Sequence, residues 1–228
     1  MSIVIKTEGL TFSYSEQEHN ILDNLSMEVK KGEILAILGL SGSGKSTLCY
    51  CLSGIIPHVY SGKLSGEVRI DGHSTQEMDM TMIATKLGIV FQNPETQLFF
   101  PMVESELAFG PENLCIDRDE IKKRIDLTLD LLNIKEKRNE KTGHLSGGQK
   151  QLIALASVLT LKPKILIFDE VMSQIDEKGK NAIKDIILQL KKEGKTVIMV
   201  SHNLDNIDIA DRIMTLKNGR LKRFEESL

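Results

Sequence analysis

The segment "GLSGSGKST", residues 39–47, constrains the fold of this chain most strongly. It matches the pattern G-x-x-x-x-G-K-[ST], with an apolar run before it and a helical pattern after it. Glycines allow backbone N–H groups to turn inward around phosphate oxygens, and the start of the following helix is favourable for an anion. The segment therefore predicts an α/β fold in which this loop joins a buried parallel strand to a helix and binds nucleotide phosphates.

Two side chains of this loop have separate predicted roles. Lys45 supplies a positive charge for the β- and γ-phosphates, and the hydroxyl of Ser46 is suited to Mg²⁺. The alternative, a flexible glycine-serine turn, is less favoured because a strand and a helix flank the motif. The residues expected to bind ATP here are Gly39, Ser41, Gly42, Ser43, Gly44, Lys45, Ser46 and Thr47.

Four compact apolar runs have the appearance of buried parallel strands, and each ends in polar residues. They are residues 33–39, 87–92, 164–170 and 196–202. Three early segments, 4–14, 25–32 and 66–72, alternate partly and predict an antiparallel sheet near the start. Asn218-Gly219 predicts a final hairpin.

Helical patterns occur at 120–133 and 176–190, and the region 93–159 contains helix signals without a convincing strand. We therefore expect one domain over residues 1–228. Its nucleotide-binding core, with the β-subdomain, is expected over about 1–92 and 160–228, and a helical subdomain over about 93–159.

Two carboxylates stand at the end of the apolar run "KILIFDE". Beside a phosphate loop, Asp169 is expected to hold Mg²⁺, and Glu170 to act as general base on the attacking water. Acids are also common at solvated strand ends, and the upstream loop strengthens the functional interpretation of the pair.

The combination of "LSGGQ" at 145–149, "ILIFDE" about twenty residues later and the upstream phosphate loop resembles the ATP-binding-cassette (ABC) ATPases. The resemblance covers nearly the whole chain. It implies a P-loop NTPase fold with a RecA-like core, an N-terminal antiparallel β-subdomain and a helical subdomain. It also implies ATP hydrolysis with ATP and Mg²⁺ bound.

The same resemblance implies roles for three further residues. Gln92 in "VFQNPE" is similar to the glutamine that reaches Mg²⁺ and the attacking water, and His202 in "VSHN" to the histidine at the γ-phosphate. Tyr14 resembles the aromatic residue that stacks on adenine. Each has a structural alternative: a polar strand end for Gln92, a structural histidine, and an aromatic residue in a strand.

A second glycine-rich turn, in "HLSGGQKQLIALAS", precedes a helix but lacks a lysine in the phosphate-loop register. The resemblance implies that this turn contacts the γ-phosphate of ATP held by another subunit. "SQID", residues 173–176, is similar to a loop that crosses the dimer interface, and Asp176 is also suited to cap the next helix. The residues expected to act across the interface are Ser146, Gly147, Gly148, Gln149 and Asp176.

Residues 91–114 resemble the corresponding segment of energy-coupling-factor ATPases, which power uptake of vitamins and transition metals. This implies a second ATPase subunit, either another copy of the chain or a related cassette, together with a transmembrane coupling subunit and a substrate-binding membrane subunit. It also implies a peripheral place on the cytoplasmic face of the membrane. The apolar residues of the segment predict either a groove for a partner helix or the core of the helical region; they are Leu98, Phe99, Phe100, Met102 and Val103. Leu152, Val171 and Met172 depart from the pattern common among relatives.

Composition and charge bear on the partners of the chain and on its cellular compartment. The formal net charge of -3 gives no basic excess for a nucleic-acid partner, and three cysteines suit a reducing compartment. No signal-peptide pattern and no run of about 20 apolar residues is present, so we expect any membrane attachment to come through another chain. A soluble ATPase of DNA repair or ribosomes is the alternative class. A cassette that binds ATP without turnover is disfavoured by Glu170 and His202.

Overall fold

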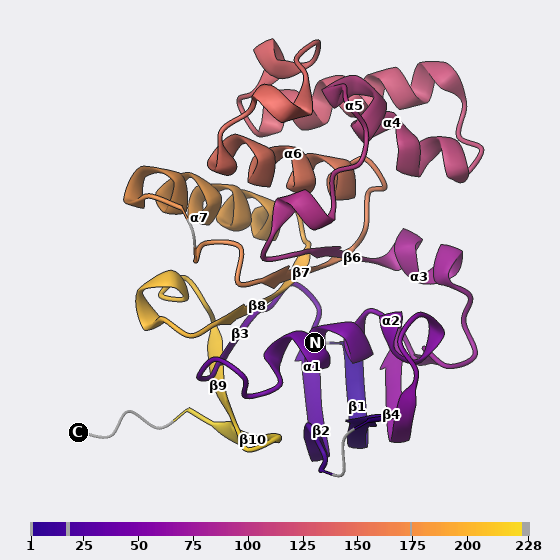
Figure 1. Ribbon diagram of the computed structural model, residues 1–228, viewed down its shortest axis with the longest axis vertical. Coiled ribbons are helices and arrows are strands. Elements are labelled where there is room, and N and C mark those ends of the chain that lie inside the picture. Colours follow the sequence, from indigo (N-terminus) through magenta and orange to yellow (C-terminus); the bar gives the residue numbers. More distant parts are fainter. Residues whose placement is uncertain (1, 17–18, 174, 225–228) are drawn as a thin grey trace.

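The computed structural model describes residues 2–16, 19–173 and 175–224. The strands form two sheets (Figure 1). The larger sheet has six strands in the order β10-β9-β3-β8-β7-β6, and the strands from β9 to β6 are parallel to their neighbours. Its strands are β3 (Ile34–Leu38), β6 (Leu87–Val90), β7 (Ile165–Asp169), β8 (Thr196–Ser201), β9 (Arg212–Lys217) and β10 (Arg220–Arg223). The four predicted buried strands are confirmed as β3, β6, β7 and β8.

The smaller sheet is antiparallel and has the order β2-β1-β4-β5. Its strands are β1 (Ile3–Tyr14), β2 (Leu22–Lys30), β4 (Gly62–Ile70) and β5 (His73–Ser74). The three early strand predictions are therefore confirmed. The final hairpin is also confirmed, because β9 and β10 pair antiparallel around Asn218 and Gly219, both of which have positive φ.

Seven α-helices lie between these strands within the described residues. They are α1 (Lys45–Leu52), α2 (Ile55–His58), α3 (Met80–Lys86), α4 (Val103–Asn113), α5 (Arg118–Leu131), α6 (Gly147–Leu159) and α7 (Glu177–Lys192). Short 3-10 turns occupy Pro94–Thr96, Lys135–Lys137, Thr142–His144 and Leu204–Asn206. Residues 91–164 are all described, and they contain helices and one isolated bridge between Met102 and Lys141 but no strand. Helices α4–α6 gather at one end of the molecule, and the antiparallel strands lie at the other (Figure 1).

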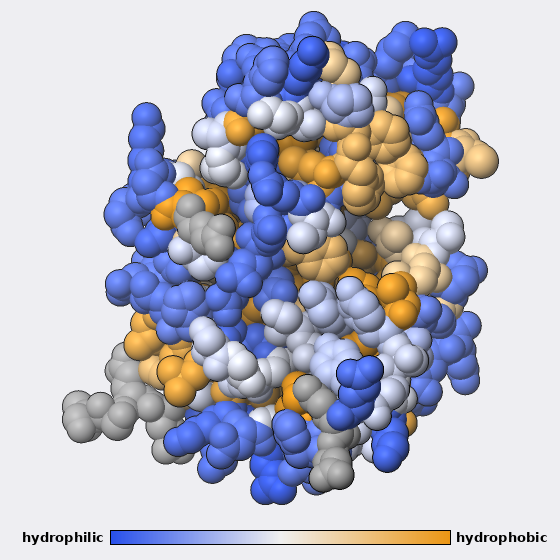
Figure 2. Space-filling model, viewed as in Figure 1, coloured by the Kyte–Doolittle hydropathy of each residue, from blue (hydrophilic) through white to orange (hydrophobic). Residues whose placement is uncertain are grey.

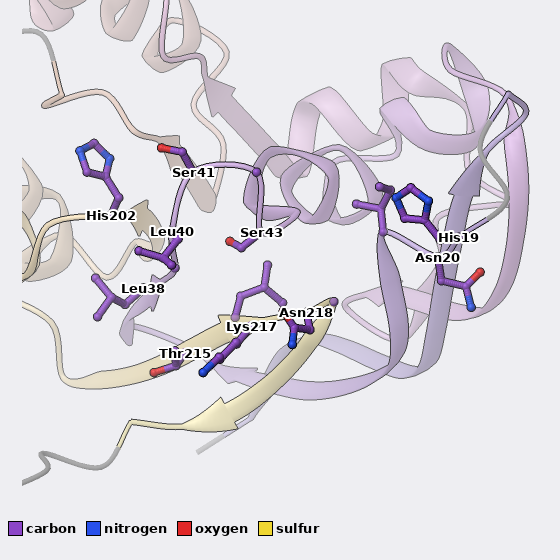
Figure 3. A pocket seen from close by; sticks show the side chains of 15 residues that line it. His19, Asn20, Leu38, Leu40, Ser41, Ser43, His202, Thr215, Lys217 and Asn218 are labelled. Carbon is purple, nitrogen blue, oxygen red and sulfur yellow. The ribbon is translucent and has the colours of Figure 1, made fainter.

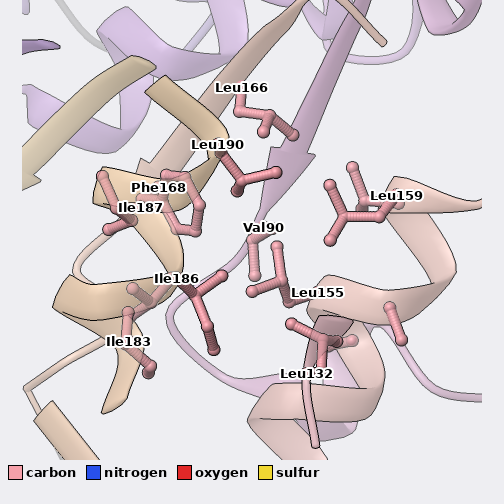
Figure 4. Close-up of a cluster of buried hydrophobic side chains, with 14 of the residues drawn as sticks. Val90, Leu132, Leu155, Leu159, Leu166, Phe168, Ile183, Ile186, Ile187 and Leu190 are labelled. Atoms are coloured by element: carbon pink, nitrogen blue, oxygen red, sulfur yellow. The ribbon is translucent and has the colours of Figure 1, made fainter. Parts of the chain in front are cut away.

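Alternate residues of the central strands face two hydrophobic clusters on opposite sides of the larger sheet. On one side, Val90, Leu166 and Phe168 pack against α5, α6 and α7 (Figure 4). On the other side, Ile165 and Ile167 belong to the cluster shared with α1 and the antiparallel sheet. Each strand is therefore buried on both faces, which explains the continuous apolar runs in the sequence.

The helical region approaches the sheet closely at β6. A Cβ placed on Gly88 would lie 2.2 Å from Cγ1 of Val158, so only glycine permits this separation of β6 and α6. The chain beyond β6 therefore leaves the sheet beside the helix that carries the second glycine-rich turn.

None of the described helices has the length and apolar composition needed to cross a membrane.

Candidate functional site

The phosphate-loop motif forms the connection between β3 and α1. Gly44 precedes the first residue of α1 and has φ of 98°, a conformation that favours glycine. A Cβ on Gly44 would lie 3.0 Å from the backbone oxygen of Ile21, so the loop also packs closely against the segment before β2. The first N–H groups of a helix have no intrahelical acceptor, and those of α1 are available to an anion at this loop.

Lys45 lies inside the loop with its side chain only 4% exposed. Its Nζ donates hydrogen bonds of 2.9 Å to the backbone oxygens of Gly39 and Leu40. It also forms an ion pair of 2.9 Å with Oε1 of Glu170. The ammonium group is thus fixed against the loop, and its counter-charge is the carboxylate that the sequence predicts to be the general base.

Ser46 and Asp169 lie side by side although 123 residues separate them. The Ser46 hydroxyl donates to Oδ1 of Asp169 over 3.2 Å. Burial raises the pKa of Asp169, the Ser46 hydrogen bond lowers it, and the nearby Glu170 charge raises it, with a net upward shift. A hydroxyl and a buried carboxylate side by side are oxygen donors of the kind that Mg²⁺ takes.

The loop itself fits a nucleotide. Ser43 Oγ is buried and has no hydrogen-bond partner among the described residues. An unpartnered buried hydroxyl is costly, and a phosphate oxygen is a suitable acceptor for it. Together with the Lys45 ammonium and the amides at the start of α1, this hydroxyl makes the loop suitable for ATP phosphates.

Glu170 is held in a conformation that is uncommon for its residue type. Its φ is 49°, in the left-handed region, and such strain is concentrated at functional sites. Oε2 of Glu170 accepts a 2.8 Å hydrogen bond from Nδ1 of His202. Burial alone raises the pKa of Glu170, but the hydrogen bonds from Lys45 and His202 outweigh burial, and the net pKa is lowered. The carboxylate is therefore ionised and engaged on both oxygens.

The raised pKa of Asp169 leads to a stability prediction. Because the pKa of Asp169 is raised in the folded chain, its carboxyl ionises more readily in the unfolded chain. The contribution of Asp169 to the free energy of unfolding therefore falls as pH rises from the ordinary aspartate pKa through the raised pKa. We expect Asp169→Asn, which keeps an oxygen for Ser46, to raise the free energy of unfolding at pH 7. The gain should shrink as pH falls toward about 4. Urea unfolding of the nucleotide-free chain at both pH values measures this, with the exposed Asp185→Asn as control. An Asp169→Asn variant less stable than the parent at pH 7 would contradict the prediction.

Gln92 follows the end of β6 and is exposed. Its Nε2 donates to Oγ of Ser173 over 3.3 Å. It lines a hollow of about 450 Å³ together with Ser46 and Asp169, so the three residues predicted to hold Mg²⁺ face one space. The same hollow has an aromatic and aliphatic wall made by Tyr50, Ile55, Val59, Tyr60 and Phe91.

Tyr14 lies at the end of β1, beside the first turn of α1. Its hydroxyl is 3.3 Å from Oγ1 of Thr47, and its ring meets Phe12 edge-on with centroids 4.9 Å apart. The residue is half-buried, so one part of the ring packs in the sheet while the rest faces the start of α1. The predicted adenine position therefore adjoins the phosphate loop.

The residues predicted to act across an interface lie at the N-termini of α6 and α7. Ser146 caps α6: its Oγ accepts from the Gln149 N–H, and Gln149 Oε1 accepts from the Ser146 N–H. Asp176 caps α7 by accepting from the Gly179 N–H, as expected from the sequence. A Cβ placed on Gly148 would lie 4.0 Å from Cγ2 of Ile175, so the N-termini of α6 and α7 are close together. Gln174, within the predicted "SQID" loop, lies outside the described residues.

A second hollow, of about 550 Å³, opens on the outer side of the phosphate loop (Figure 3). His202 stands at one side of it and His19 and Asn20 at the other. Its described lining comes from residues 19–21, 38–43, 202 and 215–219, and thus holds none of the Ser146–Gln149 turn. The sequence does not predict that Asn20, Ile21, Lys217 and Asn218 line this hollow. Asn20 and Ile21 precede β2, Lys217 and Asn218 lie at the turn of the final hairpin, and none of them belongs to a nucleotide-binding motif.

Comparison with known proteins agrees with this geometry. The family model described as ABC transporter matches residues 22–173, which is more than half of the chain. The chain belongs to the ABC transporter family. The ABC ATPase fold, the enzyme class and the resemblance drawn from the sequence are thereby confirmed.

Several relatives match this ABC chain over 96% of its length. A Pyrococcus horikoshii protein named as an ABC transporter ATP-binding protein is 46% identical, and the match covers 78% of its length. The energy-coupling factor transporter ATP-binding protein EcfA1 of Fusobacterium nucleatum is 41% identical, over 81% of its length. These names favour a transporter ATP-binding subunit over the alternative of a soluble ATPase of DNA repair or ribosomes.

Solved structures of ABC proteins are also similar. The cbiO1 protein of Clostridium perfringens, part of the transporter complex cbiONQ, gives a TM-score of 0.85 at 34% identity, covering 97% of this chain and 88% of that one. A dimeric ATP-binding cassette in a post-hydrolysis state, bound to ADP and Pi, gives 0.85 at 28% identity, covering 97% of each chain. The chain is thus an ABC transporter ATP-binding subunit that binds and hydrolyses ATP.

Proposed function

We propose that this chain is the ATPase subunit of an energy-coupling-factor-type importer for a vitamin or a transition metal ion. The observation that carries the proposal is the hollow beside Gln92. One wall holds the polar residues Ser46 and Asp169, and the other is apolar and opens toward the segment 91–114. A membrane partner seated there would touch the residue next to the reacting phosphate. The EcfA1 relative and the cbiO1 structure support this branch.

We assign the nucleotide contacts as follows. The loop amides and Lys45 bind the β- and γ-phosphates, and Tyr14 stacks on adenine. Ser46, Asp169 and Gln92 would hold Mg²⁺, which would supply positive charge beside the phosphates. A γ-phosphate at the loop competes with Glu170 for the Lys45 ammonium, so ATP binding releases one carboxylate oxygen that the ion pair otherwise occupies.

The released Glu170 is then available to the attacking water. The hydrogen bond from His202, which lowers the pKa of Glu170, persists after this release and favours the ionised carboxylate that can accept a proton. His202 keeps the carboxylate oriented through Nδ1, which must carry the proton because its partner is an ionised oxygen. Nε2 of His202 is left to face the γ-phosphate.

We further propose that two copies of the chain close around two ATP molecules. One chain carries the phosphate loop and the Ser146–Gln149 turn, and a two-fold pair lets each copy complete the other's site. The amides of Gly147 and Gly148, at the start of α6, supply the same anion-binding chemistry as α1. Asp176 and its loop would lie at this interface, and the dimeric cassette with ADP and Pi supports such a pair.

The surface proposed for the transmembrane coupling subunit is aromatic. Phe99 is 67% exposed and lies edge-on to Phe109, with ring centroids 5.9 Å apart. The buried Glu106 carboxylate accepts hydrogen bonds from the N–H groups of Phe99 and Phe100 at 2.9 and 2.8 Å, which fixes the turn that presents these rings. Apolar side chains gather on this side of the helical region, beside a hollowed part of the surface (Figure 2). This arrangement suits a helix of a membrane partner.

Co-purification tests this function. In the cell, we expect the tagged chain to purify from detergent-extracted membranes with a transmembrane coupling subunit and a substrate-binding membrane subunit, at the cytoplasmic face. Phe99→Ser combined with Phe109→Ser should lose these partners, whereas Leu127→Ser, at another exposed apolar residue, should keep them. Recovery of the chain with ribosomes or DNA, and without membrane proteins, would contradict the proposal. So would partner retention by the double variant.

A further inference from the structure

Asn206 carries a buried polar atom that has no role in the nucleotide contacts. The residue ends the 3-10 turn Leu204–Asn206 and is only 5% exposed. Its Oδ1 has no hydrogen-bond partner among the described residues, where Ser43 Oγ is the only other buried side-chain oxygen without one. A carbonyl oxygen left unpaired away from water is costly, so we expect Oδ1 to have a partner.

A small cavity adjoins Asn206 and reaches the backbone beside Glu170. Its volume is about 10 Å³, which is about the least space that holds one water molecule. One side is formed by residues 170–172, and the other by Ser201 and Asn206. The Ser201 hydroxyl is already engaged, because it accepts from the N–H of Asn203 and donates to the Asn203 oxygen, both at 3.0 Å.

The turn that follows Glu170 supplies polar groups on the other side of this cavity. The N–H of Ser173 donates to the backbone oxygen of Glu170 over 3.0 Å, which closes a turn around Val171 and Met172. No described residue accepts a hydrogen bond from the N–H of Val171 or of Met172, and these residues are 4% and 3% exposed. A water molecule between the turn and Asn206 would accept from an N–H and donate to Oδ1, which satisfies both sides.

We infer that a buried water molecule joins Asn206 Oδ1 to the turn after Glu170, and that Asn206 is thereby a positioning residue for Glu170 and His202. Glu170 directly precedes one end of this bridge, and His202 begins the loop that ends in Asn206. The bridge fixes the separation of two backbone segments whose side chains meet at 2.8 Å. The left-handed φ of Glu170, 49°, needs such support, because a strained backbone persists only where its surroundings determine it. The inference rests on the proposed role of Glu170 as the base.

A high-resolution crystal structure of the full chain tests the bridge directly. We expect density for one water molecule within about 3 Å of Asn206 Oδ1 in the parent. We expect none in Asn206→Leu, whose side chain has a similar size and no acceptor. The midpoint of urea unfolding gives an independent sign. Loss of the bridge leaves an N–H of the turn unpaired, so Asn206→Leu should lower the midpoint, whereas removal of an oxygen that has no partner should raise it.

Turnover tests the positioning role. Asn206→Leu should lower kcat about 10- to 100-fold, because small misplacements of reacting groups have effects of this size. KM for ATP should not change, because Asn206 lines neither hollow beside the phosphate loop. Asn206→Ser, which keeps an acceptor oxygen, should lie between the parent and Asn206→Leu, and it keeps the test valid if the leucine variant does not fold. Asn181→Leu, at an exposed asparagine of α7, is the matched control and should keep parental kcat.

The outcomes separate the inference from the proposed function. A cavity without water in the parent overturns the inference, and so does a higher unfolding midpoint in Asn206→Leu. If Glu170→Gln is inactive while every folded Asn206 variant keeps parental kcat, the positioning role is wrong and the proposed function stands. If Glu170→Gln itself keeps parental kcat, the role of Glu170 as base fails, and the positioning role of Asn206 fails with it.

Discussion

Replacing Glu170 with glutamine is expected to abolish ATP turnover while ATP binding persists. The glutamine keeps the size of the side chain but cannot accept a proton from water, and general-base catalysis contributes about 100- to 10,000-fold to rate. Binding should persist, or tighten, because Lys45 no longer has a carboxylate partner competing with the γ-phosphate. Steady-state kcat and the Kd of a fluorescent ATP analogue measure the two effects.

The matched control is Glu136→Gln, at an exposed glutamate in the helical region. It should leave both kcat and Kd unchanged. Turnover by Glu170→Gln at the parental rate would remove Glu170 as the base. Loss of ATP binding in that variant would show that Glu170 has a structural role at the loop instead.

Replacing Ser146 with arginine is expected to remove ATPase activity without weakening ATP binding by the separate chain. In the proposed pair, the long side chain occupies the space at the start of α6 where the partner's γ-phosphate is to lie. Ser146 belongs to none of the hollows that adjoin the phosphate loop of its own chain, so local ATP affinity should not change.

Loss of a helix cap is a second effect of this substitution, costing about 1 kcal/mol. Asp117→Ala removes the corresponding cap of α5, away from the proposed interface, and controls for it. Asp117→Ala should retain activity at temperatures well below its unfolding midpoint. Parental ATPase activity in Ser146→Arg would contradict the proposed action of Ser146 on a second subunit.

Much of this fold is predictable from local patterns. The runs ending at Gly39 and Glu170 are apolar without interruption because both faces of their strands are buried, and this feature is visible in the sequence. The adjacency of Ser46 and Asp169 follows from the same reasoning, because parallel strands place their carboxyl ends at one edge of a sheet.

Other parts of the site depend on side-chain directions that the sequence does not contain. The ion pair of Lys45 with Glu170 exists because both groups turn inward at the loop, and no spacing rule predicts it. Asn206 reaches the turn after Glu170 because β7 and β8 are neighbours in the sheet, and an asparagine in a turn has no sequence signature for such a contact. Lys217 and Asn218 reach the loop only through the final hairpin.

In the proposed pair, ATP on one chain is enclosed by the Ser146–Gln149 turn of a second copy. Light scattering of Glu170→Gln tests it most directly. With Mg²⁺ and ATP, the mass should rise from the 25.5 kDa of one chain to twice that value, and it should not rise without nucleotide. Adding Ser146→Arg to the same variant should keep the mass at one chain although ATP remains bound. A Glu170→Gln chain that binds ATP and stays single, or a Ser146→Arg combination that still doubles, would contradict the account.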